Sequence, residues 1–167
     1  MLSCLLQCYR SKQQSIPQLR QLGRPGILTL QGANGVPVYA LLVALGEQTA
    51  TLQLETGRHR VRLVALGRLW RGDFATLWRV PPGYAAGLPE GSRGPVIDQL
   101  ATQLARIDGA PAFSAGQAQL DATLRERVRA FQRAQGLQAD GQPGPMTFLQ
   151  LDSATDGNGP RLQTDPN

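Results

Sequence analysis

The stretch that decides the fold runs from Leu120 to Leu151, and its centre reads LRERVRAFQRAQGLQADGQPGPMT over residues 124–147. Apolar residues recur in its first half at intervals of four, four and three: Leu120, Leu124, Val128 and Phe131. This spacing predicts one face of a helix. Gly136 follows the last turn, and glycine readily adopts the left-handed conformation that ends helices.

The residues after this helix predict a turn and then a second short helix. Residues 140–144 (DGQPG) are turn formers, and Pro145 suits the first position of a helix over 146–151. Helix and turn together give the pattern Val128-x-x-Phe131-Gln132-x-x-x-Gly136-Leu137-x-x-Asp140-Gly141-x-x-Gly144-x-x-Thr147-x-x-x-Leu151. This pattern resembles the second half of the small three-helix peptidoglycan-binding domain, which is appended to many cell-wall amidases and envelope proteins.

The first half of that domain also has a counterpart. Residues 91–104 (GSRGPVIDQLATQL) resemble its opening helix. The chain departs from the family at Ala101, where the family usually carries Gln, and in a short, altered loop over residues 109–113. The resemblance implies a three-helix domain over residues 91–153 whose partner is peptidoglycan.

Composition and charge exclude several classes of protein. With 167 residues, 41% hydrophobic and 17% charged, the chain is expected to be globular, with one or two domains. It has no run of 18 apolar residues, and residues 1–6 are too short for a signal peptide. We therefore expect membrane contact only through segments upstream of this chain.

The net charge of +5 invites a nucleic-acid interpretation. Residues 1–80 contain ten Lys or Arg and three Asp or Glu, whereas residues 81–167 contain seven and nine. The basic residues are scattered through predicted strands and turns, without interleaved aromatic residues on which bases could stack. We expect no nucleic-acid partner; a basic nucleic-acid-binding protein is the second alternative.

The first half of the chain predicts an α+β domain of N-terminal helices and an antiparallel sheet, over residues 1–80. Helices are expected over 2–22 and 64–70, and strands over 26–31, 36–45, 49–54, 59–63 and 74–79. The long apolar strand 36–45 is expected to be central and covered on both faces. A Pro-Pro-Gly sequence opens a linker over residues 81–90, and the tail over 154–167 is expected to be disordered.

A second resemblance covers this first half. It is carried by three segments: LQC (6–8), LRQLGRPGILTL (19–30) and WRGDFATLWR (70–79). They resemble the periplasmic part of the general secretion pathway protein A family, in which a degenerate papain-like cysteine-peptidase domain precedes a peptidoglycan-binding domain. The resemblance implies a periplasmic fragment of an inner-membrane-anchored protein that helps to place the outer-membrane secretin of type II secretion in the cell wall. The secretin and a protein B-type component are implied partners.

Cysteine-peptidase chemistry needs a thiolate, an imidazole base and a group that orients the base. The peptidase relatives place the base after a Gly-containing hairpin, where this chain has PVY (37–39). They place the orienting residue on the next strand, which here reads TATLQL (49–54). His59 lies beyond it and is expected at the surface. We expect a non-catalytic protein; a cell-wall-directed cysteine peptidase or amidase is the first alternative.

The two cysteines, Cys4 and Cys8, lack a second pair and a neighbouring histidine, so we expect neither a metal site nor a cofactor. They are either small buried residues, or one of them pairs with a cysteine outside this chain.

The candidate ligand-binding residues belong to the second half. Peptidoglycan offers sugar hydroxyls, N-acetyl groups and stem-peptide carboxylates. Arg125, Arg129 and Arg133 are four residues apart and form a stripe on one flank of the predicted helix, and guanidinium groups suit carboxylates. The other candidates are polar residues at or after the end of this helix: Gln132, Asp140, Gln142 and Thr147. The alternative for Asp140 and Thr147 is a structural role in the loop.

Overall fold

The computed structural model describes residues 6–111, 114, 116–155 and 159–164. These residues form two compact units. Unit 2 comprises residues 8–77 and 159–164, and unit 1 comprises residues 6–7 and 78–155. Each unit is described by itself below.

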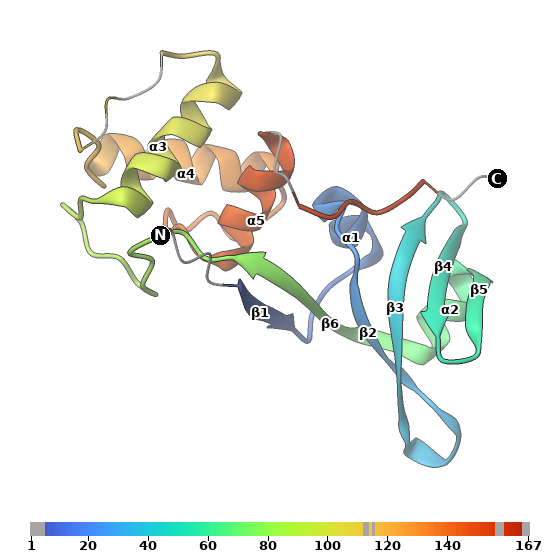
Figure 1. The fold of residues 1–167 in the computed structure, drawn as a ribbon. Helices are drawn as coiled ribbons and strands as arrows, with labels where there is room; N and C mark the ends of the chain where they lie inside the picture. Colours follow the sequence, from blue (N-terminus) through green and yellow to red (C-terminus); the bar gives the residue numbers. More distant parts are fainter. Residues whose placement is uncertain (1–5, 112–113, 115, 156–158, 165–167) are drawn as a thin grey trace. The chain divides into compact units, whose positions relative to one another are not determined.

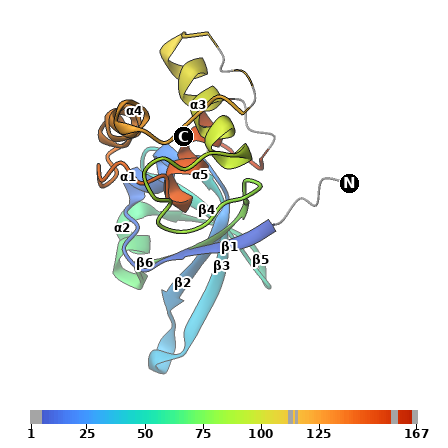
Figure 2. The ribbon, with the colours of Figure 1, turned by 90° about the vertical axis from the view of Figure 1, so that its left-hand side faces the viewer.

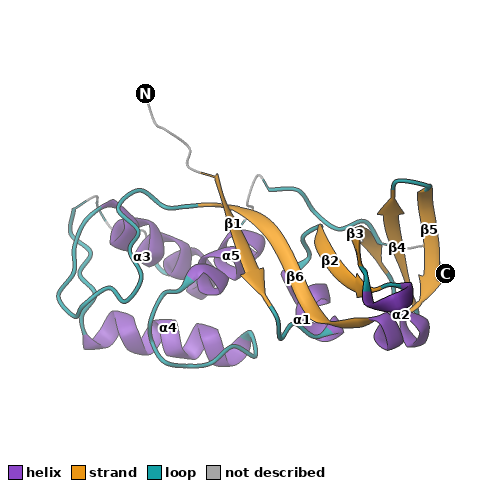
Figure 3. Ribbon diagram, turned by 90° about the horizontal axis from the view of Figure 1, so that it is seen from below, coloured by secondary structure: helices purple, strands orange, loops and turns teal. Residues whose placement is uncertain are grey.

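Unit 2 is built on an antiparallel sheet, so the predicted α+β class is confirmed (Figure 1). Its strands are β1 (Leu6–Ser11), β2 (Gly26–Gln31), β3 (Pro37–Leu45), β4 (Thr49–Leu54), β5 (Gly57–Arg62) and β6 (Trp70–Arg79), and its helices are α1 (Ile16–Leu22) and α2 (Leu63–Leu69). The strand order is β1-β6-β2-β3-β4-β5, and the pairings from β6 through to β5 are antiparallel. Helix α2 lies against β4 and β5 (Figure 3).

The core of unit 2 follows from alternation along the strands. The residues on the inner face are apolar and nearly inaccessible: Leu28, Leu30, Ala40, Leu42, Ala50, Leu52 and Phe74. Helix α1 adds Leu19 and Leu22, and α2 adds Leu66, all of them buried. Helix α1 begins at Ser15, whose hydroxyl accepts from the Gln18 N–H while the Gln18 side chain accepts from the Ser15 N–H. This reciprocal cap fixes the start of the helix.

Two expectations for unit 2 were wrong. Residues 6–11, expected to be helical, form strand β1 beside β6, because pairing with a neighbouring strand overrides weak local preference. Strand β3 is buried on both faces only at its last two residues, Ala44 and Leu45. Its first half belongs to the long β2–β3 hairpin that projects from the rest of the sheet (Figure 1), which leaves Val38 and Tyr39 exposed.

The described part of the tail departs from the expected disorder. Leu162 N–H donates to the Gly23 carbonyl at 2.8 Å, and Gln163 exchanges two backbone hydrogen bonds with Val43 and Leu45, at 3.0 and 3.1 Å. The pairing of Gln163 with Ala44 is parallel. Strand β2 begins opposite Leu42 and leaves the last residues of β3 unpaired on that side, so the tail completes their hydrogen bonds.

Unit 1 contains three helices (Figure 2): α3 (Pro95–Asp108), α4 (Ala122–Ala134) and α5 (Pro145–Ala154). Its core is lined by apolar residues from all three: Ile97, Leu100, Leu104, Leu124, Val128, Phe131, Phe148, Leu149 and Leu151. The segment over residues 81–90 has no regular secondary structure. Within this unit Tyr84 lies edge-on to both Trp78 and Phe148, at ring-centroid distances of 5.2 and 5.8 Å. Burial raises the pKa of the Tyr84 phenol.

Candidate functional site

Helix α4 carries most of the candidate residues, and its boundaries follow from the sequence. The Asp121 carboxylate accepts from the Leu124 N–H at 2.8 Å and so caps the first turn. Gly136, just past the end, has φ of 62°, the left-handed conformation that its position predicts. The predicted apolar face is confirmed, because Leu124, Val128 and Phe131 are buried.

The side chain of Gln132 is the centre of a hydrogen-bond network behind the loop that follows α4. Its Nε2 lies 3.0 Å from Asp140 Oδ1, 2.9 Å from the Gln142 carbonyl and 3.2 Å from Thr147 Oγ1. Its Oε1 accepts from the Gly141 N–H at 2.9 Å. Gln132 is only 2% exposed and Thr147 only 3%. Both residues therefore shape the loop from inside, whereas Asp140 lies exposed at its surface.

The first arginine of the stripe, Arg125, also contacts this region. Its Nη2 donates to the Leu88 carbonyl at 3.2 Å. The Gln142 amide, oriented with its oxygen towards Arg125, accepts from Nη1 at 3.0 Å and donates to the same carbonyl at 3.2 Å. Arg125 and Gln142 thus connect the loop after α4 to the segment that precedes α3.

The other two arginines share a carboxylate that the sequence reasoning missed. Glu126 lies 3.2 Å from Arg129 Nη1 and 2.7 Å from Arg133 Nη2. Hydrogen bonds from Arg133 and Arg129 lower the pKa of Glu126. The spacings of three and seven residues along the helix were the available signal. A ligand carboxylate at this stripe would exchange with Glu126 for the same guanidinium groups.

Arg129 also lies over the loop. A Cβ atom at Gly141 would come within 3.0 Å of Arg129 Nε, and Gly141 has φ of 74°. Glycine is therefore required there both for backbone conformation and for the arginine to pack. The structure thus places Arg129, Arg133, Asp140 and Gln142 at or near one surface, with Arg125 half-buried beneath it.

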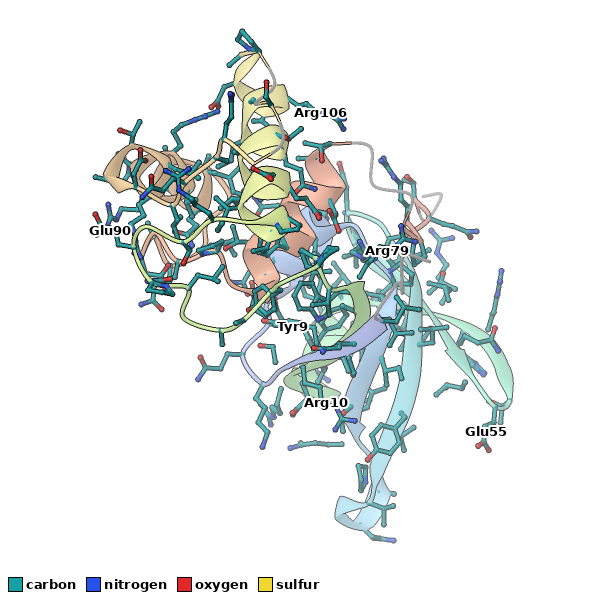
Figure 4. All side chains as sticks on the ribbon, turned by 60° about the vertical axis from the view of Figure 1, so that its left-hand side comes forward. Tyr9, Arg10, Glu55, Arg79, Glu90 and Arg106 are labelled. Carbon is teal, nitrogen blue, oxygen red and sulfur yellow. The ribbon has the colours of Figure 1, made fainter. Side chains whose placement is uncertain are left out.

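The thiol and the imidazole of unit 2 lie far apart. Cys8 is exposed on β1 and His59 is exposed on β5, the two outer strands of the six-stranded sheet. Five inter-strand spacings separate them, or roughly 24 Å. His59 Nε2 instead lies 2.9 Å from Thr56 Oγ1, beside the β4–β5 turn marked by Glu55 in Figure 4. Cys4 lies outside the described residues.

The described residues lack a metal-binding cluster and a membrane-spanning helix. No three or more His, Cys, Asp or Glu side chains in it are grouped so that they could hold a metal ion. None of the helices in this part is both long enough and apolar enough to cross a membrane.

The chain is similar to known proteins over both of its units. Residues 93–151, which contain α3, α4 and most of α5, match the family model described as a putative peptidoglycan binding domain. General secretion pathway protein A of Aeromonas hydrophila is 30% identical over 149 residues, which cover 89% of this chain and 27% of that protein. The chain is similar to the periplasmic region of general secretion pathway protein A. It spans about a quarter of the length of this relative.

A solved structure also matches both units of the chain. It is the crystal structure of a periplasmic domain of the EpsAB fusion protein of the Vibrio vulnificus type II secretion system, with a TM-score of 0.55 and 26% identity. The match covers 99% of this chain and 81% of that one. The similarity to these relatives thus extends over the sheet-bearing unit as well as over residues 93–151.

Proposed function

We propose that this chain is a non-catalytic, peptidoglycan-binding periplasmic module of a type II secretion assembly protein, and that it helps to place the outer-membrane secretin in the cell wall. The observation that carries the proposal is the peptidoglycan-binding family match over residues 93–151, on a chain similar to general secretion pathway protein A. The secretin, a protein B-type component and an inner-membrane anchor upstream of this chain belong to the same proposal.

The contact with peptidoglycan is assigned to the surface beside the end of α4. Arg129 and Arg133 there present guanidinium groups that pair with a carboxylate, and a stem peptide carries such groups. Asp140 and Gln142 add polar groups, while Gln132 and Thr147 hold the loop in shape from within. Shallow polar sites of this kind bind weakly, and retention on the wall depends on the many repeats of the polymer.

Unit 2 is proposed to be a peptidase-like domain without peptidase activity. The support is the separation of Cys8 and His59 on opposite edges of the sheet, because a base must lie within hydrogen-bond reach of the thiol that it activates.

Co-sedimentation with purified sacculi tests the proposal. The wild-type chain should be retained after nuclease treatment and at moderate salt, without release of soluble wall fragments. The double variant Arg129→Ala/Arg133→Ala should be retained severalfold less. The matched control Arg58→Ala/Arg62→Ala removes the same charge from β5 of unit 2 and should behave like wild type. Failure of the wild type to sediment would refute peptidoglycan binding, and equal losses in both variants would indicate non-specific attraction.

A further inference from the structure

A pocket of about 220 Å³ lies within unit 1 between α3 and α4. Helix α4 contributes Thr123 and Arg127 to its wall. Successive residues of an α-helix are rotated by about 100°, so Arg127 points to the opposite side of α4 from Arg129. The pocket is therefore separate from the arginine stripe.

The floor of the pocket is apolar and small. It is formed by Ala101 of α3, Ala118 of the preceding segment and Leu124 of α4, all of them buried. Two of the three residues end at Cβ, which leaves room for a group as small as a methyl. Placing such a group there removes its apolar surface from water.

The rim of the pocket is polar and uncharged at three positions. Gln117, Gln119 and Thr123 line it, and amide and hydroxyl groups both donate and accept hydrogen bonds. Gln117 and Thr123 are exposed, and neither side chain has a hydrogen-bond partner among the described residues. A ligand that is itself an amide with a methyl group fits an apolar floor beneath such a rim.

The walls are held in place before any ligand arrives. Asp98 of α3 accepts from the Gly116 and Ala118 N–H groups at 2.8 and 3.3 Å. Leu120 exchanges two backbone hydrogen bonds, both 2.9 Å, with residues 91–92. A preformed site loses less conformational entropy on binding, so these bonds favour a functional cavity over a gap between side chains.

The charges around the pocket disfavour an anionic ligand. The Arg127 guanidinium already binds Asp108 through both Nε and Nη2, at 3.1 and 2.7 Å. Asp121, which also lines the pocket, carries a negative charge and is occupied in capping α4. The negative charge of this aspartate would repel a stem-peptide carboxylate, whereas it would not repel a neutral sugar.

We propose that this pocket binds the N-acetyl group of a peptidoglycan sugar, with the methyl on the alanine floor and the amide at the Gln and Thr rim. The inference rests on the proposed function of unit 1 and names a second contact with the same polymer. It assigns glycan recognition to one flank of α4, opposite the flank assigned to stem-peptide carboxylates.

The test is an NMR titration of the full chain with tri-N-acetylchitotriose, in which the amide shifts of residues 117–124 are followed. Cellotriose, which lacks the acetamido group, and a free stem tripeptide are the comparison probes. Thr123→Val keeps the side-chain shape without the hydroxyl, and Gln117→Ala removes one amide. Each should raise the dissociation constant about fivefold, the equivalent of one hydrogen bond. The unit 2 control Arg58→Ala/Arg62→Ala should bind the sugar like wild type.

Four results would overturn the inference: no shifts at residues 117–124, equal binding of cellotriose, unchanged affinity in both pocket variants, or binding of the tripeptide at this pocket instead of the sugar. Retention on sacculi without sugar binding would remove the pocket assignment and leave the proposed function intact. Sugar binding without retention on sacculi would refute the proposed function and would leave only a pocket for an N-acetyl sugar.

Discussion

Replacing Gln132 with Leu tests whether the loop after α4 is held from within. The substitution keeps a side chain of similar volume and removes the amide. It leaves the buried Gly141 N–H without its acceptor, and it removes a donor from the Gln142 carbonyl and from Thr147 Oγ1. Nε2 has only two hydrogens for three acceptors, so it cannot make three full hydrogen bonds, and their free energies must not be summed as if it did. One orphaned buried donor costs about 1–3 kcal/mol, and with the weakened acceptors we expect a loss of about 2–4 kcal/mol.

Native-state hydrogen exchange measures this loss within unit 1, because amides of α4 and α5 report the opening of that unit alone. Gln138→Leu is the matched control, since Gln138 is an exposed residue of the same loop. It should change the opening free energy by less than about 0.5 kcal/mol. The argument fails if Gln132→Leu stays within that same margin, or if the Gly141 amide exchanges no faster in the variant.

Three further predictions concern other parts of the chain. Because Arg133 and Arg129 lower the pKa of Glu126, any stabilisation from the ion pairs is present above the unfolded pKa and is lost as the pH falls through the folded pKa. Arg133→Ala should therefore raise the Glu126 pKa, and a pH titration of the carboxyl ¹³C chemical shift measures it. Deleting residues 159–167 removes three backbone hydrogen bonds and should lower the stability of unit 2 by about 1–3 kcal/mol in hydrogen exchange. Gly26→Ala should destabilise unit 2 by about 1–3 kcal/mol, because the added Cβ would clash with a phenylalanine ring and a carbonyl. Gly67→Ala on the open face of α2 should instead stabilise it by about 0.5–1 kcal/mol. Urea denaturation measures both effects.

Local signals in the sequence were sufficient to locate helices α4 and α5 of unit 1. The four-four-three spacing of apolar residues fixed the face of α4, and Gly136 and Pro145 marked a helix end and a helix start that the structure contains. In unit 2, strands β2 and β4 also lie where the sequence predicted them, over residues 26–31 and 49–54. In each case the determining interaction lies within a few residues along the chain.

Local sequence patterns did not predict the features that depend on pairing between distant parts of the chain. Strand β1 exists because β6, about sixty residues later in the chain, offers it an edge, and the tail at Gln163 pairs with the end of β3. Gln132 shows a related difficulty. A glutamine at the end of a helix is ordinarily a surface residue, and only the path of the loop over residues 140–147 turns it inward. The pocket at Thr123 depends on how α3 packs against α4, which no spacing within either helix encodes.

The two flanks of α4 make a joint prediction for retention on sacculi. Substitutions at sites with no shared partners add in free energy, and Thr123 shares no partner with Arg129 or Arg133 among the described residues of unit 1. If both flanks contact the polymer at once, combining Thr123→Val with Arg129→Ala/Arg133→Ala should reduce retention by the product of the separate fold-changes. If only the stripe binds, the combined variant should match the stripe variant. Because avidity on a repeating polymer masks weak single effects, the comparison requires sacculi in limiting amount. A combined loss of retention no larger than the greater single loss would rule out simultaneous contact by both flanks.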